Sequence, residues 1–147
     1  MMQDLSLIVV ATACGVEWHG KDAIFSGVCI DSRKVQPGDL FVALHGERFD
    51  AHDFLADVQD AGAVAALVEK IDPAVAMPQL LVENAVHALG QVAKLNRDMF
   101  AGKIIGLTGS AGKTTTKEMI AAILEQVGHP LVTAGNLNNH LGVPLTL

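Results

Sequence analysis

The residues best suited to chemistry lie in one glycine-rich stretch. It consists of Thr108, Gly109, Ser110, Ala111, Gly112, Lys113 and Thr114. Its two glycines let backbone N–H groups approach phosphate oxygens, because no Cβ stands in the way. Lys113 can reach the β- and γ-phosphates as a point charge, and the Thr114 hydroxyl can ligate Mg²⁺. The pattern therefore predicts binding of a nucleoside triphosphate together with Mg²⁺.

The segments on either side of this loop are predicted to hold it in place. Residues 103–108 form an apolar run of strand length, and residues 131–133 look like a second strand. Between them, one face of a predicted helix carries Met119, Ile120, Ile123, Leu124 and Val127. A helix that begins at the loop directs its free N–H groups and its dipole at a bound anion. The order strand, loop, helix, strand predicts the first β-α-β unit of a parallel sheet.

Other glycine-containing motifs fit this stretch less well. The strict phosphate-loop pattern needs glycine at position 107, where the chain has Leu107, but the Gly-Lys-Thr end is intact. A dinucleotide fingerprint needs GxGxxG, whereas Gly106, Gly109 and Gly112 give GxxGxxG. A nucleophile elbow centred on Ser110 needs glycine two residues earlier, where the chain has threonine. We therefore interpret Ser110 as a phosphate-loop residue rather than a nucleophile.

The composition is that of a packed domain with a local ligand site. Half of the 147 residues are apolar, 18% are charged, and the net charge is −6. The ten Lys and Arg residues are scattered, which argues against a nucleic-acid partner. Cys14 and Cys29 form no CxxC pair, which favours two free thiols over a zinc site. Residues 5–10 form a mainly apolar stretch, but Asp4 precedes them and a membrane span needs ~20 residues. We expect a cytoplasmic monomer without membrane insertion.

The first half of the chain predicts a small mixed α/β unit. Helical character is expected over residues 4–14 and 52–62, and extended runs over 24–30, 40–44, 63–68 and 79–82. Asn84 is a good N-cap for a helix that continues to Asn96, and we place a domain boundary there, giving units 1–83 and 84–147. One β-α-β segment cannot complete a sheet that is covered on both faces, so we expect the chain to be part of a longer protein.

Several segments together resemble the Mur ligases. Thr-Gly-x-x-Gly-Lys-Thr-Thr at 108–115 is similar to their nucleotide loop, which adds Thr115 to the expected ATP contacts. Asp-Ser-Arg at 31–33 and the segments at 37–44 and 46–54 are similar to their N-terminal UDP-sugar domain. Residues 134–144 favour the branch that adds a dipeptide, because the amino-acid-adding branch typically carries Thr-Thr-Pro after Gly-Asn. The implied fold is α/β, with a small mixed UDP-sugar-binding domain followed by the start of a phosphate-loop-type parallel-sheet ATPase domain.

The resemblance also implies a set of substrate-binding residues. They are Ser32, Arg33, Arg48, Phe49, His52, Asn136, Asn138 and Asn139. Arginines can fork onto a diphosphate, and a phenylalanine can stack on uracil. Each of the first five can instead be a surface charge or a core aromatic. The asparagines follow a predicted strand end, where open parallel sheets collect ligands, but asparagine is also a favoured turn residue.

The reaction implied by the resemblance is amide formation in peptidoglycan precursor synthesis. ATP would phosphorylate the terminal carboxylate of a UDP-N-acetylmuramoyl-tripeptide, and the amine of D-alanyl-D-alanine would attack the acyl phosphate. Lys113 and the Mg²⁺ held by Thr114 are the expected catalytic groups, because they stabilise charge that develops in phosphoryl transfer. Other groups that the family needs are not within the 147 residues, so we expect this chain alone to be inactive.

Three alternatives stay open at this point. A sister ligase that adds a different amino acid is disfavoured by residues 136–144. A nucleotide-binding module without catalysis would bind without turnover. An ordinary phosphate-loop kinase or ATPase is disfavoured by Leu107 and by the UDP-domain resemblance.

Overall fold

A four-stranded parallel sheet forms the centre of the first part of the chain. The structure is a computed structural model that describes residues 2–18, 20–46, 49–134, 137 and 139–146. The strands are β3 (Gly27–Cys29), β4 (Asp39–Val42), β7 (Ala65–Val68) and β8 (Gln79–Leu81), hydrogen-bonded in that order. All three strand pairs are parallel. The predicted runs at 40–44, 63–68 and 79–82 are therefore confirmed as strands.

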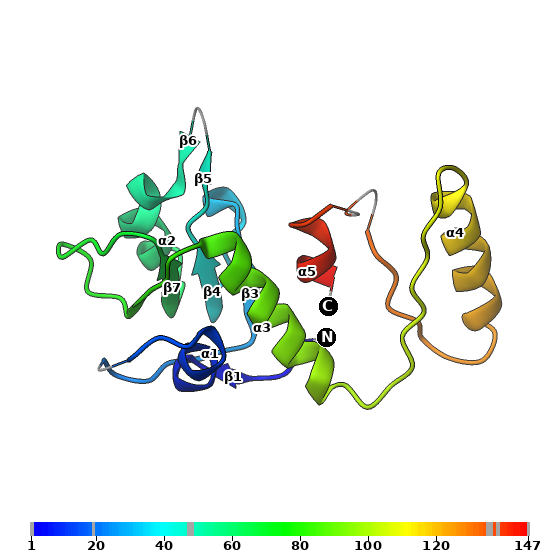
Figure 1. Ribbon diagram of the computed structural model, residues 1–147, viewed down its shortest axis with the longest axis horizontal. Coiled ribbons are helices and arrows are strands. Elements are labelled where there is room, and N and C mark those ends of the chain that lie inside the picture. Colours follow the sequence, from blue (N-terminus) through cyan, green and yellow to red (C-terminus); the bar gives the residue numbers. More distant parts are fainter. Residues whose placement is uncertain (1, 19, 47–48, 135–136, 138, 147) are drawn as a thin grey trace.

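Helices cover both faces of this sheet (Figure 1). On one face lie α1 (Leu7–Cys14) and α3 (Ala85–Met99), and their apolar residues share a core with Leu40, Val42 and Leu67. On the other face lie α2 (Leu55–Asp60) and the short 3₁₀ helices η1 (Ser32–Lys34) and η2 (Ala51–Phe54). Their core includes Phe41 and Val68. Successive strand residues thus enter opposite cores, which explains why these strands are apolar without alternation.

Local signals place the helix ends as expected. The Asn84 side chain accepts a hydrogen bond from the N–H of His87 at 2.8 Å, so Asn84 is the predicted N-cap of α3. Gly62 follows α2 with φ of 102° and donates its N–H to the carbonyl of Gln59, as a helix stop should. The first helix begins later than predicted, because Ser6 caps it through the N–H of Val9.

Two features of the first unit differ from the sequence prediction. The extended run at 24–30 divides at Ser26: β2 (Ile24–Phe25) pairs antiparallel with β1 (Leu5–Ser6), and β3 joins the central sheet. An unpredicted hairpin joins β5 (His45–Gly46) to β6 (Phe49–Asp50). Strands of two residues carry no measurable hydrophobic period, so the sequence could not reveal them.

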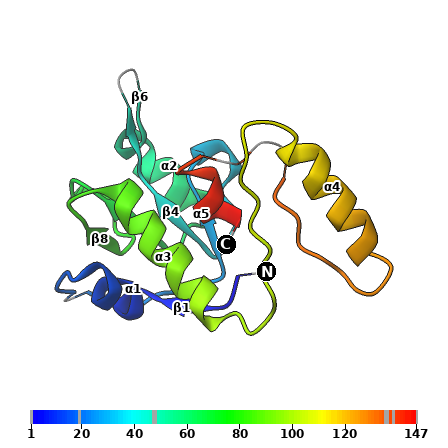
Figure 2. The same cartoon turned by 45° about the vertical axis from the view of Figure 1, so that its right-hand side comes forward.

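After α3 the chain leaves the sheet and forms an arm that carries α4 (Lys113–Leu124) (Figures 1 and 2). The helix predicted here is confirmed. The strands predicted at 103–108 and 131–133 are wrong, since neither run has helix or strand structure. A strand exists only through hydrogen bonds to a neighbour, and the described residues supply no neighbouring strand for either run. Residues 101–112 are all exposed.

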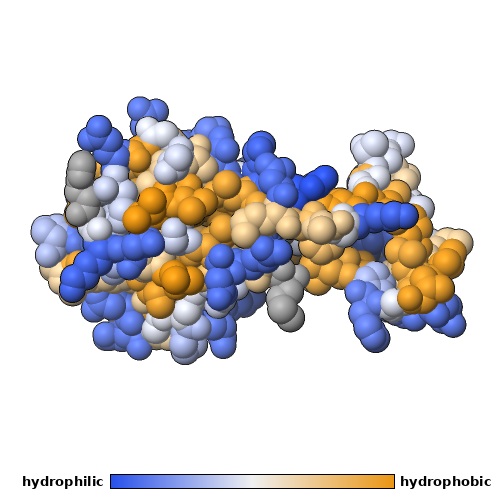
Figure 3. All heavy atoms as spheres, turned by 90° about the horizontal axis from the view of Figure 1, so that it is seen from below, coloured by the Kyte–Doolittle hydropathy of each residue, from blue (hydrophilic) through white to orange (hydrophobic). Residues whose placement is uncertain are grey.

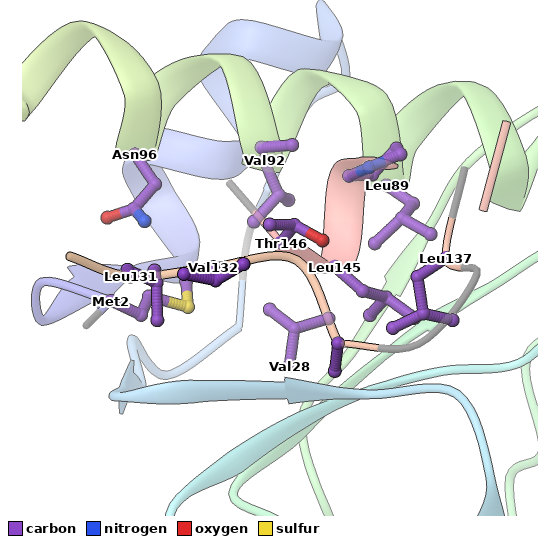
Figure 4. A pocket seen from close by; sticks show the side chains of 13 residues that line it. Met2, Val28, Leu89, Val92, Asn96, Leu131, Val132, Leu137, Leu145 and Thr146 are labelled. Atoms are coloured by element: carbon purple, nitrogen blue, oxygen red, sulfur yellow. The ribbon is translucent and has the colours of Figure 1, made fainter. Parts of the chain in front are cut away.

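The last described residues return to the first unit. There α5 (Gly142–Thr146) lies beside α3, and a pocket of about 320 Å³ separates α3 and β3 from the returning segment (Figure 4). Its lining is mostly apolar, with Val28, Leu131 and Leu145, but also includes the polar residues Asn96 and Thr146. The boundary predicted between residues 83 and 84 stays a prediction; α3, which follows it, buries Leu89 in the first core. Within the described part of the chain, no helix is long and apolar enough to cross a membrane.

Candidate nucleotide and substrate sites

The glycine-rich loop runs directly into α4. Gly112 is the N-cap of this helix and has φ of 76°, a left-handed conformation that glycine adopts without a steric penalty. No side chain of the described residues caps this helix start, and its first turn holds no acidic residue. Helix geometry leaves the first N–H groups without acceptors inside the helix. The start of α4 therefore offers free backbone donors and the positive end of a dipole, which together bind phosphate.

Lys113 and Thr114 lie at this helix start. The Nζ of Lys113 donates to the carbonyl of Gly109 at 2.5 Å, so the side chain folds back over the loop. Thr114 is exposed in the first turn, whereas the hydroxyl of Thr116 donates to the carbonyl of Gly112 at 3.0 Å. Mg²⁺ commonly takes few protein oxygens and completes its shell with phosphate and water. An exposed hydroxyl beside Lys113 fits that requirement.

The arm around the loop exposes apolar side chains. Met119, Ile123 and Val127 are 62, 67 and 84% exposed, and Ala121 is the buried residue of α4. Residues Ile104, Ile105 and Leu107, which precede the loop, are also exposed. Figure 3 shows apolar surface on the part of the molecule that carries α4. The helix pattern predicted from the sequence is present; on its apolar face Met119 and Ile123 are exposed, and Ile120 and Leu124 are partly buried.

The second group of predicted site residues follows the carboxyl ends of the central strands. Arg33 lies in η1, just after β3, and its side chain is 84% exposed. Its Nε and one terminal nitrogen donate to the two carboxylate oxygens of Asp31, each at 2.8 Å. This bidentate hydrogen bonding by Arg33 lowers the pKa of Asp31 to about 2. Ser32 is half-buried at the start of the same turn.

Phe49 is an exposed aromatic on the β5–β6 hairpin. Its ring stacks on Phe54, with centroids 5.2 Å apart and planes inclined by 18°, and Phe49 remains 54% exposed. One face is therefore supported from within the chain while part of the ring stays open. Such a ring can stack on a flat heterocycle.

His52 lies deeper than Phe49, and both of its ring nitrogens have partners. Nδ1 donates to Oδ1 of Asp50 at 2.6 Å, and Nε2 accepts from the backbone N–H of Glu69 at 2.9 Å. Only 12% of the side chain is exposed. The role assigned to this histidine by the sequence, direct substrate binding, stays a prediction.

Among the remaining predicted residues, Asn139 is in the described part of the chain. Its Oδ1 accepts from the N–H groups of Leu141 and Gly142, at 3.2 and 2.7 Å, so it shapes the turn before α5. Arg48, Asn136 and Asn138 lie outside the described residues.

Sequence reasoning missed two carboxylates that organise this region. Asp50 accepts from the backbone N–H of His52 and lies 3.5 Å from the Nδ1 of His45. The N–H and ring of His52 lower the pKa of Asp50. Glu69, at the carboxyl end of β7, accepts from the N–H of Ala85 at 2.7 Å. A carboxylate directly after a buried strand, and the spacing Asp-x-His, are signals that could have indicated both.

The two groups of candidate residues are far from each other. Figures 1 and 2 both show α4 and the β5–β6 hairpin at opposite ends of the molecule. A single ligand that contacts both groups must therefore be long.

Comparisons with known proteins are consistent with this arrangement. The model described as "Mur ligase family, catalytic domain" matches residues 24–97, half of the chain, and "Mur ligase middle domain" matches residues 107–147. The chain belongs to the Mur ligase family. The first match covers the parallel-sheet unit, and the second begins just before the glycine-rich loop.

Two curated relatives within the Mur ligase family carry the same name. The UDP-N-acetylmuramoyl-tripeptide--D-alanyl-D-alanine ligase of Escherichia coli (strain K12) is 50% identical over 131 residues, covering 89% of this chain and 29% of that protein. The ligase of the same name from Bacillus subtilis (strain 168) is 40% identical over 129 residues, covering 86% and 28%. The chain thus spans less than a third of the length of these relatives.

Solved structures of Mur ligases confirm the mixed α/β fold with its parallel sheet. A crystal structure of MurF from Acinetobacter baumannii matches with a TM-score of 0.84 and 39% identity, over 99% of this chain and 33% of that one. MurF from Thermotoga maritima, solved in complex with ADP, matches with a TM-score of 0.72 and 38% identity, over 82% and 28%.

Proposed function

We propose that this chain forms the nucleotide-binding and UDP-binding portion of a MurF-type ligase. In this role it contributes to the ATP-dependent addition of D-alanyl-D-alanine to a UDP-N-acetylmuramoyl-tripeptide during peptidoglycan precursor synthesis. The observation that carries the proposal is the open start of α4, where Gly112 leaves backbone donors free beside Lys113. The shared name of the curated relatives supports the choice of reaction.

The nucleotide site is the loop from Thr108 to Thr115. Bound ATP with Mg²⁺ supplies the phosphoryl group that activates the carboxylate. Lys113 would leave the carbonyl of Gly109 and bind the β- and γ-phosphates, where its charge acts on the transferring group. Thr114 would provide the protein oxygen for Mg²⁺. The neighbouring backbone N–H groups orient the phosphate chain.

The substrate site is the carboxyl edge of the central sheet. Arg33 offers a guanidinium fork for the diphosphate, and Phe49 offers a partly open ring for uracil. The three asparagines of residues 136–139 belong to the same proposal as contacts of the substrate. Binding at the two ends of the molecule suits a substrate that has its UDP group at one end and its reacting carboxylate at the other.

A sister ligase of the MurE type is the second candidate for the same fold. It would share the nucleotide loop and differ in the amine that it accepts. The relatives described above carry the D-alanyl-D-alanine name, which favours the MurF type. Location in the cytoplasm is part of the proposal, because both substrates are cytoplasmic precursors in this scheme. A monomeric state is proposed as well.

The decisive experiment separates binding from ligation. The chain is incubated with UDP-N-acetylmuramoyl-tripeptide, ATP, Mg²⁺ and D-alanyl-D-alanine, each omitted in turn, and amide product is measured by mass spectrometry. The Escherichia coli ligase serves as positive control. We expect ATP and UDP-precursor binding without product, because a ligase must also deliver the amine into a water-excluding site. Absence of both kinds of binding would overturn the proposal.

A further inference from the structure

The hydrogen bonds of His52 fix which of its nitrogens carries the proton. A backbone N–H can only donate, so the bond from Glu69 requires a lone pair on Nε2. The proton of the ring is then on Nδ1, where it is donated to the Asp50 carboxylate. The ring is therefore a neutral imidazole held in one tautomer by two fixed partners.

These bonds belong to a continuous path between elements that are distant in the sequence. Asp50 ends the β5–β6 hairpin, His52 lies in η2, and Glu69 follows β7. The Oε1 of Glu69 then accepts from the N–H of Ala85, the first residue of α3. His52 is the central link of this path, because its ring bonds both to Asp50 of the hairpin and to the backbone N–H of Glu69, which follows β7.

The hairpin needs such a link to keep its position. Each of its strands has two residues, and an isolated hairpin is at best marginally stable in water. Phe49, which the hairpin carries, is 54% exposed, whereas the side chain of His52 is 12% exposed and has both nitrogens bonded. His52 thus has neither a free polar atom nor much surface to offer a ligand.

We infer that His52 is a positioning residue that fixes Phe49 for the uridine end of the substrate and does not contact the substrate itself. The inference rests on the proposed function and refines it, because it transfers one predicted substrate contact to a supporting role. The Asp50–His52–Glu69 path holds the hairpin against the carboxyl end of β7, and this sets where the open ring of Phe49 lies.

A double-mutant cycle with uridine diphosphate as the probe tests this role. His52→Ala removes both bonds and should raise the dissociation constant of uridine diphosphate roughly three- to tenfold. Phe49→Ala should weaken binding to a similar extent. In the Phe49→Ala background, His52→Ala should add less than about twofold, since its effect passes through Phe49. Losses that multiply would show that His52 acts independently of Phe49 and would overturn the inference.

Partial replacements resolve the two ends of the link. His52→Gln can keep an acceptor for the Glu69 N–H, and His52→Asn can keep a donor for Asp50. We expect hydrogen exchange of the Glu69 amide to rise about tenfold in His52→Asn and His52→Ala, and to stay near wild type in His52→Gln. The control is His87→Ala, which removes an exposed imidazole from α3.

The two hypotheses fail in different ways. If the wild-type chain does not bind uridine diphosphate, the UDP-binding part of the proposed function is overturned. If it binds, but His52→Ala leaves Glu69 exchange and the amide shifts of the hairpin unchanged, the positioning role is overturned. Nitrogen chemical shifts of the His52 ring give an independent check, because a protonated Nε2 contradicts the bond on which the inference depends.

Discussion

Arg33 donates two hydrogen bonds of 2.8 Å to the carboxylate of Asp31, so one edge of its guanidinium group already has an anionic partner. A diphosphate that approaches the same edge of the guanidinium must displace Asp31 from these two donors. Asp31→Asn removes the competing charge but keeps an oxygen that can accept from the N–H of Arg33. We expect the affinity for uridine diphosphate to rise roughly two- to fivefold, the scale of an exposed ion pair. The gain should vanish in an Arg33→Ala background; a gain that persists there contradicts a role for Arg33.

The same pair predicts a pH dependence at the carboxyl edge of the sheet. The pKa of Asp31 is about 2 in the folded chain, below its ordinary value of 3.8. A folded pKa that is lowered contributes stability above the unfolded pKa, and this is lost as pH falls from 3.8 towards 2. Carboxyl titration by NMR should show a midpoint for Asp31 near pH 2, and Arg33→Ala should move it up towards 3.8. An unchanged midpoint in that variant would mean that Arg33 is not the cause.

Replacement of Lys113 tests the nucleotide site. Lys113→Ala should weaken ATP binding roughly 10- to 100-fold, since hydrogen bonds to charged groups are worth about 1.5–3 kcal/mol. Circular dichroism should be unchanged, because the side chain contacts only the loop carbonyl of Gly109 among the hydrogen bonds described here. Lys94→Ala is the matched control, as Lys94 pairs with Asp98 on the surface of α3. Equal ATP affinity in folded Lys113→Ala would remove the loop from the site.

Alanine replacements of Gly112 and Gly106 test whether ATP binding needs the left-handed backbone at Gly112 or only a flexible loop. Gly112→Ala forces a side chain into the left-handed conformation at φ of 76°, which costs about 1–2 kcal/mol. We expect up to about tenfold weaker ATP binding and a lower helix content in α4. Gly106 has an ordinary φ, and a Cβ there meets no atom within 4 Å, so Gly106→Ala should bind ATP as the wild type does. Similar losses in both variants would argue against a special role of the Gly112 turn.

The core of the central sheet should respond to truncation in the usual way. Leu67, in β7, is fully buried between the sheet and the helices α1 and α3. Leu67→Ala should lower the free energy of unfolding by about 2–5 kcal/mol in urea titrations followed by tryptophan fluorescence. Leu81 is 51% exposed at the end of β8, and Leu81→Ala should cost about 1 kcal/mol or less. Equal losses would contradict the burial that the structure assigns to β7.

Local sequence signals were sufficient to predict those elements whose defining residues are close together in the chain. The Asn84 cap, the Gly62 stop and the apolar strands β4 and β7 are all recognisable because each is written in a few neighbouring residues. The start of α4 at the glycine-rich loop follows the same logic. These elements needed no knowledge of distant contacts.

Features that depend on contacts between residues far apart in the sequence could not be predicted from local signals. The apolar run at 103–108 has the composition of a strand, yet the described residues offer it no neighbour to pair with. The division of residues 24–30 at Ser26 depends on the pairing of Ile24 with Ser6, which no short window contains. The Glu69 partner of His52 was missed for the same reason, since it is 17 residues away.

The exposed connection between α3 and α4 also offers a site for cleavage by a protease. Residues 101–112 have no helix or strand, and Lys103 is exposed within them, whereas Arg97 and Lys94 belong to α3. Trypsin should therefore cut after Lys103, although Lys21 and Lys70 of the sheet unit are also exposed outside helices and strands. Nucleotide bound at the start of α4 would shield Lys113 from the same enzyme while leaving Lys103 open, so a digestion pattern alone can report occupancy of the phosphate loop.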